Sequence, residues 1–242
     1  MWVKSGKPIL LFALGLGLSM LVWMAGEALI HLPMFRLRAI RVSGAPHVSL
    51  TQVQWVIQQD VQGNLFTVNL AAVQSAFAKL PWVSSVDVRR HWPDELDVQL
   101  VEHQAVARWN DDGLVDRQGE VFHAASAQNL PQLVGPDDSS VQVMQMWQNV
   151  SRIVAPIGRK PVRVSMSPRG NWRATLDNGV EIVMGRDEQV LPRLTRWVAV
   201  YPAMLSQLAQ LNAPLARVDL RYPQGFAVQM APVPATSGEK VS

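Results

Sequence analysis

Side chains that could perform catalysis or hold a metal do not occur in a recognised catalytic or metal-binding motif in this sequence. No histidine has a second histidine or a carboxylate at a metal-ligand spacing such as HExxH, and the chain has no cysteine. The adjacent acids Asp94–Glu95 and Asp111–Asp112 lie in turn-like contexts. Because neighbouring residues on a strand point to opposite faces, neither pair is placed like the two carboxylates of a glycosidase. GxSxG, Walker A, SxxK and GxGxxG motifs do not occur. We therefore predict that the protein is not an enzyme, with no catalytic residue, metal, cofactor or small-molecule substrate. The histidines are His31, His47, His91, His103 and His123.

The distribution of charge favours a protein partner over a nucleic acid. The net charge of +3 comes from scattered Lys and Arg residues, without a dense basic stripe interleaved with aromatic side chains. From Arg152 to Arg221 there are eleven Lys and Arg against five Asp and Glu, whereas Arg36 to Glu120 has eight against ten. We expect the C-terminal half to attract an acidic partner.

One apolar run near the N-terminus is long enough to cross a membrane. The eighteen residues Ile9–Gly26 carry no charge, and the run reaches Leu32 with only Glu27 interrupting it. A helix of this length spans about 27 Å, close to the roughly 30 Å hydrocarbon core of a bilayer. We therefore predict a single transmembrane helix over 9–32, after a cytoplasmic stub of residues 1–8.

A cleaved signal peptide is the alternative interpretation of this run. Lys4 and Lys7 would form its basic region, and the small residues from Ala25 to Ala28 its cleavage site. The apolar segment exceeds the about 7–15 residues of a signal peptide, which favours an uncleaved anchor. Basic residues on the two sides are nearly balanced, so the expected type II orientation depends on the short stub staying in the cytoplasm.

After Pro33 the pattern changes to short elements that predict an α+β fold. Strand alternation at Ile40 and Val42 precedes two helical stripes, over 49–57 and 69–80, with Pro81 expected to end the second helix. Two more alternating strands follow, over 86–89 and 96–100. This order predicts two helices covering one face of a three-stranded sheet. That is the POTRA arrangement, which we assign to residues 36–104.

Residues 105–231 predict a second unit, a mixed β-sheet with flanking helices. Helical stripes begin near Ser140 and at Val190, the second with an expected bend at Pro202. An Asp177–Asn178–Gly179 hairpin turn joins two of the expected strands. The strands are expected at 105–109, within 114–122, and at 162–166, 172–176, 180–184, 218–222 and 226–230. Residues 232–242 are expected to form a disordered tail.

The last expected strand, 226–230, has two interpretations. A terminal strand at a sheet edge offers unpaired N–H and C=O groups, which an extended partner segment can complete by β-augmentation. In the other interpretation the strand only closes the sheet against its own chain. The residues alone favour this second interpretation.

Several motifs carry a more specific signal. The segment LPWVSSVDVRRHWPDEL at 80–96 continues through Val101–Glu102–His103 and Ala107–Arg108–Trp109–Asn110. Further motifs are Val115–Asp116, Gly119–Glu120–Val121–Phe122, Tyr201–Pro202 and Val218–Asp219–Leu220–Arg221–Tyr222. In this order they resemble the FtsQ/DivIB family over nearly the whole chain beyond the apolar run.

The resemblance implies an essential divisome scaffold of the inner membrane, with its bulk in the periplasm at the division septum. Such a protein would link early cytoplasmic and late periplasmic cell-division proteins and help to control septum formation. Its closest partners would be FtsB and FtsL, with FtsB held on the C-terminal β-domain, which favours β-augmentation of the last strand. The alternative is a POTRA-containing translocation or outer-membrane assembly factor, but such proteins typically carry repeated POTRA units before a barrel.

By position, the resemblance places the FtsB interface on the last hairpin, with two further arginines as basic contacts. Tyr222 would supply apolar area with a polar tip, and Arg221 a guanidinium for an acidic partner. The family often has serine in place of Gln224 and tryptophan in place of Met230, although methionine suits an adaptable apolar surface. The expected contacts are Arg221, Tyr222, Gln224, Gly225, Phe226, Met230, Arg169 and Arg186.

Overall fold

The computed structural model describes residues 6–30, 36–210 and 214–231. The chain divides into two compact units, Met1–His103 and Gln104–Ser242. Most of the expected cytoplasmic stub and all of the expected disordered tail lie outside the described residues.

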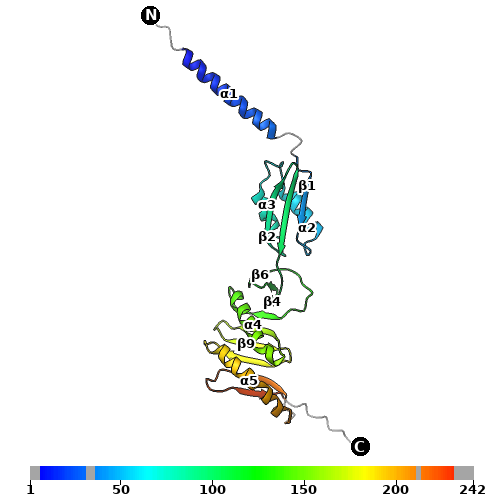
Figure 1. Ribbon diagram of the computed structural model, residues 1–242, viewed down its shortest axis with the longest axis vertical. Helices are drawn as coiled ribbons and strands as arrows, with labels where there is room; N and C mark the ends of the chain where they lie inside the picture. Colours follow the sequence, from blue (N-terminus) through cyan, green and yellow to red (C-terminus); the bar gives the residue numbers. More distant parts are fainter. Residues whose placement is uncertain (1–5, 31–35, 211–213, 232–242) are drawn as a thin grey trace, which may run out of the picture. The chain divides into compact units, whose positions relative to one another are not determined.

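The first helix, α1, spans Gly6–Ile30 and contains most of the segment predicted to cross a membrane (Figure 1). Its described large apolar side chains are exposed, from Phe12 to Met24. No helix among the described residues reaches the length and hydropathy of a membrane-spanning segment. The predicted end of the segment, at Leu32, lies outside those residues.

The remainder of the first unit is a three-stranded sheet with two helices. β1 (Ala39–Ser43), β2 (Val83–His91) and β3 (Glu95–Glu102) lie in the order β1-β3-β2. β3 pairs with β1 in parallel and with β2 antiparallel. Side chains alternate between buried and more exposed along β3, so one face of the sheet forms the core.

The two helices that accompany this sheet begin at side-chain caps that the sequence contains. Ser49 and Gln52 form a capping box before α2 (Leu50–Asp60), and Asn69 caps α3 (Leu70–Phe77). α3 ends three residues before Leu80, the last residue of the predicted stripe, because Lys79 and Leu80 donate turn-type hydrogen bonds to Ala76 and Phe77. Residues from both helices and from the sheet share one buried cluster, which includes Val56, Phe77, Leu96 and Val98.

The second unit contains a nine-stranded mixed sheet in the order β12-β11-β10-β9-β8-β7-β4-β5-β6. One of its strands, β7, was not predicted. It has three residues, too few for a period-two pattern, and it pairs in parallel with β4 and β8. The strands are β4 (Ala107–Trp109), β5 (Gly113–Val115), β6 (Val121–Phe122), β7 (Gln132–Val134), β8 (Pro161–Met166), β9 (Trp172–Leu176), β10 (Glu181–Gly185), β11 (Leu215–Asp219) and β12 (Ala227–Met230).

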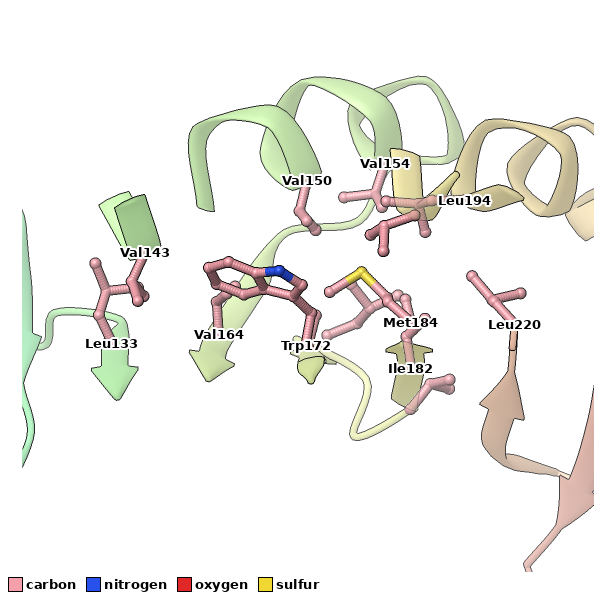
Figure 2. Close-up of a cluster of buried hydrophobic side chains, with 14 of the residues drawn as sticks. Leu133, Val143, Val150, Val154, Val164, Trp172, Ile182, Met184, Leu194 and Leu220 are labelled. Atoms are coloured by element: carbon pink, nitrogen blue, oxygen red, sulfur yellow. The ribbon is translucent and has the colours of Figure 1, made fainter. Parts of the chain in front are cut away.

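Two long helices pack against this sheet. α4 (Ser140–Val154), followed by the 3-10 turn η2 (Ala155–Ile157), and α5 (Val190–Gln210) carry the predicted apolar stripes. Pro202 lies within α5 and does not end it. Figure 2 shows Val150 and Val154 of α4 and Leu194 of α5 above side chains of the strands, among them Trp172 and Met184. The core of the unit therefore lies between the helices and one face of the sheet.

The last two strands correct the predicted boundaries. β11 covers 215–219 rather than 218–222, and β12 begins at Ala227 rather than at residue 226. Asp219 accepts the backbone N–H of Arg221 at its Oδ1 at 3.0 Å, a local side-chain bond that competes with continuation of the strand. Tyr222 consequently lies in the connection between the strands and not within β11.

Candidate partner-binding surface

β12 is one of the two edge strands of the nine-stranded sheet, and all four of its residues are exposed. It pairs antiparallel with β11 on one side. Just beyond β12, Ala231 donates its backbone N–H to the carbonyl oxygen of Pro214 at 2.8 Å. Since N–H groups alternate in direction along a strand, those of Val228 and Met230 point away from β11. This edge can therefore accept another strand.

Large apolar side chains lie along this edge and on the connection that precedes it. Tyr222 is 54% exposed, Phe226 38%, Val228 41% and Met230 48%. We call these four residues the β12 edge surface. Val228 and Met230 are two residues apart and therefore point to the same face of the strand. Val228 was missed in the sequence, although its alternation with Met230 was a usable signal.

The connection between β11 and β12 forms a hollow of about 600 Å³. It brings together four of the predicted contacts, whereas Met230 lies at the opposite end of β12, across from Leu215. The lining residues are Tyr222, Pro223, Gln224, Gly225, Phe226 and Ala227. A partner that follows the whole edge would thus pass from the hollow along the strand to Met230.

The three predicted basic contacts lie at one end of the sheet. Arg169 is in the turn between β8 and β9, and Arg186 directly follows β10. Gly185 pairs with Trp172 and Val183 with Asp219, so the end of β10 lies beside the start of β9 and the end of β11. Arg169, Arg186 and Arg221 are all exposed. Strand pairing alone brings them together from three separate segments.

The three arginines differ in what they bind. Arg221 donates to both carboxylate oxygens of Asp219, at 2.6 to 3.0 Å. This hydrogen bonding lowers the pKa of Asp219 and raises that of Arg221, although partial burial opposes both changes. Arg169 and Arg186 form no ion pair with any other described residue. Their charges therefore remain available for an acidic partner.

Two arginines of α5, which the sequence analysis did not select, hold the backbone around this site. Arg193 is 5% exposed and donates from Nη2 to the Met184 carbonyl at 3.1 Å and to Asp187 Oδ1 at 2.7 Å. This contact with Arg193 lowers the pKa of Asp187. Arg196 donates from Nη2 to the Pro223 carbonyl at 3.1 Å. The position of Arg193 within the apolar stripe of α5 was the signal that could have identified a buried arginine.

Comparison with known proteins agrees with this architecture. The model "POTRA domain, FtsQ-type" matches residues 35–103, and "Cell division protein FtsQ/DivIB, C-terminal" matches residues 107–221. Neither model describes an enzymatic domain. The second match ends at Arg221, so Tyr222 and β12 lie beyond it.

Individual relatives cover more of the chain. The cell division protein FtsQ of Xanthomonas campestris pv. campestris is 37% identical over 88% of this chain and 80% of its own length. The cell division protein FtsQ of Coxiella burnetii is 35% identical over 94% and 93%, and that of Nitrosospira multiformis 38% over 83% and 86%. From these matches and the two-unit fold, we conclude that the chain belongs to the FtsQ/DivIB family of cell-division proteins.

Proposed function

We propose that this protein is a divisome scaffold that binds FtsB, and through it FtsL, on the β12 edge surface. It performs no reaction and acts by bringing early and late cell-division proteins together at the septum. The exposed edge strand is the observation that carries this proposal. Outward N–H groups on Val228 and Met230 supply hydrogen bonds for a partner strand, and the apolar side chains beside them supply contact area.

The exposed arginines at one end of the sheet favour a partner that carries acidic residues. Arg169 and Arg186 are exposed and project from two neighbouring turns. An FtsB segment with acidic residues next to an extended apolar stretch would complement them. In the proposed complex the acidic residues meet the arginines while the extended stretch pairs with β12.

The proposed location is the inner membrane, with both folded units in the periplasm. α1 supports this proposal, because apolar side chains are exposed along its described length, and a helix that is apolar all round needs a lipid or protein environment. The uncharged run Ile9–Gly26 in the sequence has the length of a bilayer core. The short stub before it would remain in the cytoplasm.

Amide hydrogen exchange on the full chain tests the binding mode. Addition of FtsB should slow exchange at Val228 and Met230, whose N–H groups face outward, more than at Gln229, whose N–H faces β11. Equal protection of all three amides, or none, would contradict β-augmentation.

A cellular experiment tests the role separately. A fluorescent fusion of this chain, expressed while the native protein of its host is depleted, should form midcell bands and restore division of the filaments. A uniform envelope signal without rescue would overturn the scaffold proposal, whatever the exchange experiment shows.

A further inference from the structure

Phe66 and Trp92 form an exposed aromatic pair in the first unit. Their rings meet edge to face, with centroids 5.1 Å apart and an interplanar angle of 66°. Phe66 remains 41% exposed and Trp92 56%. Exposed aromatic side chains that lie next to each other indicate a binding surface more strongly than single exposed residues do.

The aromatic pair lies where the chain enters the folded part of this unit. The backbone of Arg36 forms an isolated antiparallel β-bridge with Asn64, which lies two residues before Phe66. Arg38 donates its backbone N–H to the Asp94 carbonyl at 2.9 Å, two residues after Trp92. The first residue of β1 pairs with the first residue of β3, so the loop after α2 and the β2–β3 hairpin share this end of the sheet with the incoming chain.

Arg90 holds the two aromatic segments together. Its Nε donates to the Leu65 carbonyl at 2.6 Å and its Nη2 to the Val68 carbonyl at 3.0 Å. The guanidinium of a residue on β2 thus fixes the loop that carries Phe66 beside the hairpin that carries Trp92. The aromatic pair is therefore supported by charge-assisted hydrogen bonds from the fold itself.

The covalent chain limits how far this surface can be from α1. The helix ends at Ile30, and Arg36 follows after five intervening residues. Six residue steps reach at most about 20 Å, even when they are fully extended. If α1 spans the bilayer, as proposed above, the entry point of the unit lies within that distance of the membrane surface.

We propose that the aromatic pair inserts into the headgroup region of the membrane and docks this end of the first unit on the lipid surface. Tryptophan is enriched at the membrane interface because its ring is apolar and its indole N–H finds polar partners there. The contact would restrict the orientation of the unit that follows the anchor.

The nearby cations are mostly paired with carboxylates, so the proposed lipid contact should not depend on anionic headgroups. Arg38 pairs with Asp94 at 3.3 Å, Arg41 with Glu95 at 3.1 Å and Arg89 with Asp87 at 2.6 Å. Carboxylates thus compensate most cations around the pair. We expect contact with vesicles of phosphatidylcholine alone and little change with added salt.

The test uses single-cysteine labels on the full chain, which has no native cysteine. An environment-sensitive fluorophore is attached at Gln62, in the loop of Phe66, and in a second sample at Ser84, an exposed residue at the other end of β2. Seven residue steps along the strand, about 23 Å, separate Ser84 from His91 beside Trp92. A third label at Ser19 in α1 reports the anchor. Each protein is reconstituted into phosphatidylcholine vesicles with spin-labelled lipids as short-range quenchers.

We expect acyl-chain quenchers to quench the label at Ser19. The label at Gln62 should be quenched by headgroup quenchers and shifted to the blue, whereas the label at Ser84 should show neither effect. Trp92→Ala should abolish the effect at Gln62. Trp55→Ala should not, because Trp55 is equally exposed, at 59%, but lies on α2. Phe66→Ser provides a second variant of the pair.

The outcomes separate this inference from the proposed function. Absence of quenching at Ser19 would contradict the membrane anchor itself, and this inference with it. Quenching at Ser19 with identical behaviour at Gln62 and Ser84 would leave the anchor intact and overturn the lipid contact. Protection of Gln62 only after FtsB or another protein is added would likewise overturn it, in favour of a protein contact.

Discussion

Asp219 binds Arg221 through both carboxylate oxygens, with Nη2 2.6 Å from Oδ2 and Nε 2.9 Å from Oδ1. Arg221 was expected to offer its guanidinium to an acidic partner, but in this structure Asp219 already neutralises it. An incoming carboxylate must compete with this pair, whereas Arg169 and Arg186 have no described ion-pair partner. We therefore expect Arg169 and Arg186 to contribute more to the binding of an acidic partner than Arg221 does.

The double substitution Arg169→Glu and Arg186→Glu should weaken FtsB binding and reduce its dependence on salt. Exposed charges contribute up to about 1 kcal/mol each, so a loss of roughly tenfold in affinity is expected. Isothermal titration at low and physiological ionic strength measures both effects. The control is Lys160→Glu with Arg163→Glu, which changes the net charge equally at two exposed residues next to or on β8. Equal losses in the two variants would show a general charge effect instead of a specific contact.

The Asp219–Arg221 pair should make stability depend on pH only in acid. Arg221 lowers the pKa of Asp219 below the ordinary aspartate value of 3.8. The carboxylate is thus easier to ionise in the folded than in the unfolded chain, and its contribution is present above pH 3.8 and lost as pH falls through the lower folded pKa. Since Arg221 is 60% exposed, screening by solvent keeps this contribution small.

Urea unfolding of the wild type and Asp219→Asn tests this dependence. The wild type should be more stable by a constant amount from pH 7 to about pH 5, and the difference should shrink below that range. A difference that grows on acidification would mean that the sign assigned to this pair is wrong.

Alanine substitutions of the two tyrosines of the chain should distinguish an effect on partner binding from an effect on the stability of the fold. Tyr222→Ala removes exposed apolar area from the β12 edge surface, and should weaken FtsB binding by about 2 kcal/mol or more without unfolding the unit. Tyr201→Ala should instead destabilise the unit by about 3 kcal/mol or more, because Tyr201 is 2% exposed and packs edge to face on Trp197. Pull-down and thermal unfolding of both variants provide the comparison. Unchanged affinity of Tyr222→Ala would count against this interface.

Proline substitutions along β12 test which backbone groups the partner uses. Val228→Pro removes an outward N–H, and should reduce FtsB binding while the unit stays folded, because proline is tolerated at a sheet edge. Gln229→Pro removes an N–H that faces β11, and should lower the free energy of unfolding as well. Circular dichroism and binding of the two variants distinguish these effects. If Val228→Pro binds like the wild type, side-chain packing alone holds the partner.

Most local elements of the fold could be predicted because they depend on residues close in sequence. The capping box of Ser49 and Gln52 and the apolar stripes of α4 and α5 each lie within one element. β7 could not be located in the same way, because it is held by parallel strands from distant segments. The end of β11 was missed although its signal is local, since Asp219 accepts the backbone N–H of Arg221 two residues later.

The features of the candidate site likewise fall into two groups, those that depend on the local sequence and those that depend on tertiary structure. The sequence by itself determined that the chain has a basic C-terminal half, an apolar last strand and none of the catalytic motifs considered, because these are properties of residue type and order. Only the tertiary structure decided that β12 lies at an edge with exposed side chains, that Arg169, Arg186 and Arg221 lie at one end of the sheet, and that Asp219 neutralises Arg221. The physical reason is that strand order depends on pairing between segments distant in the sequence, which no local pattern of residues encodes.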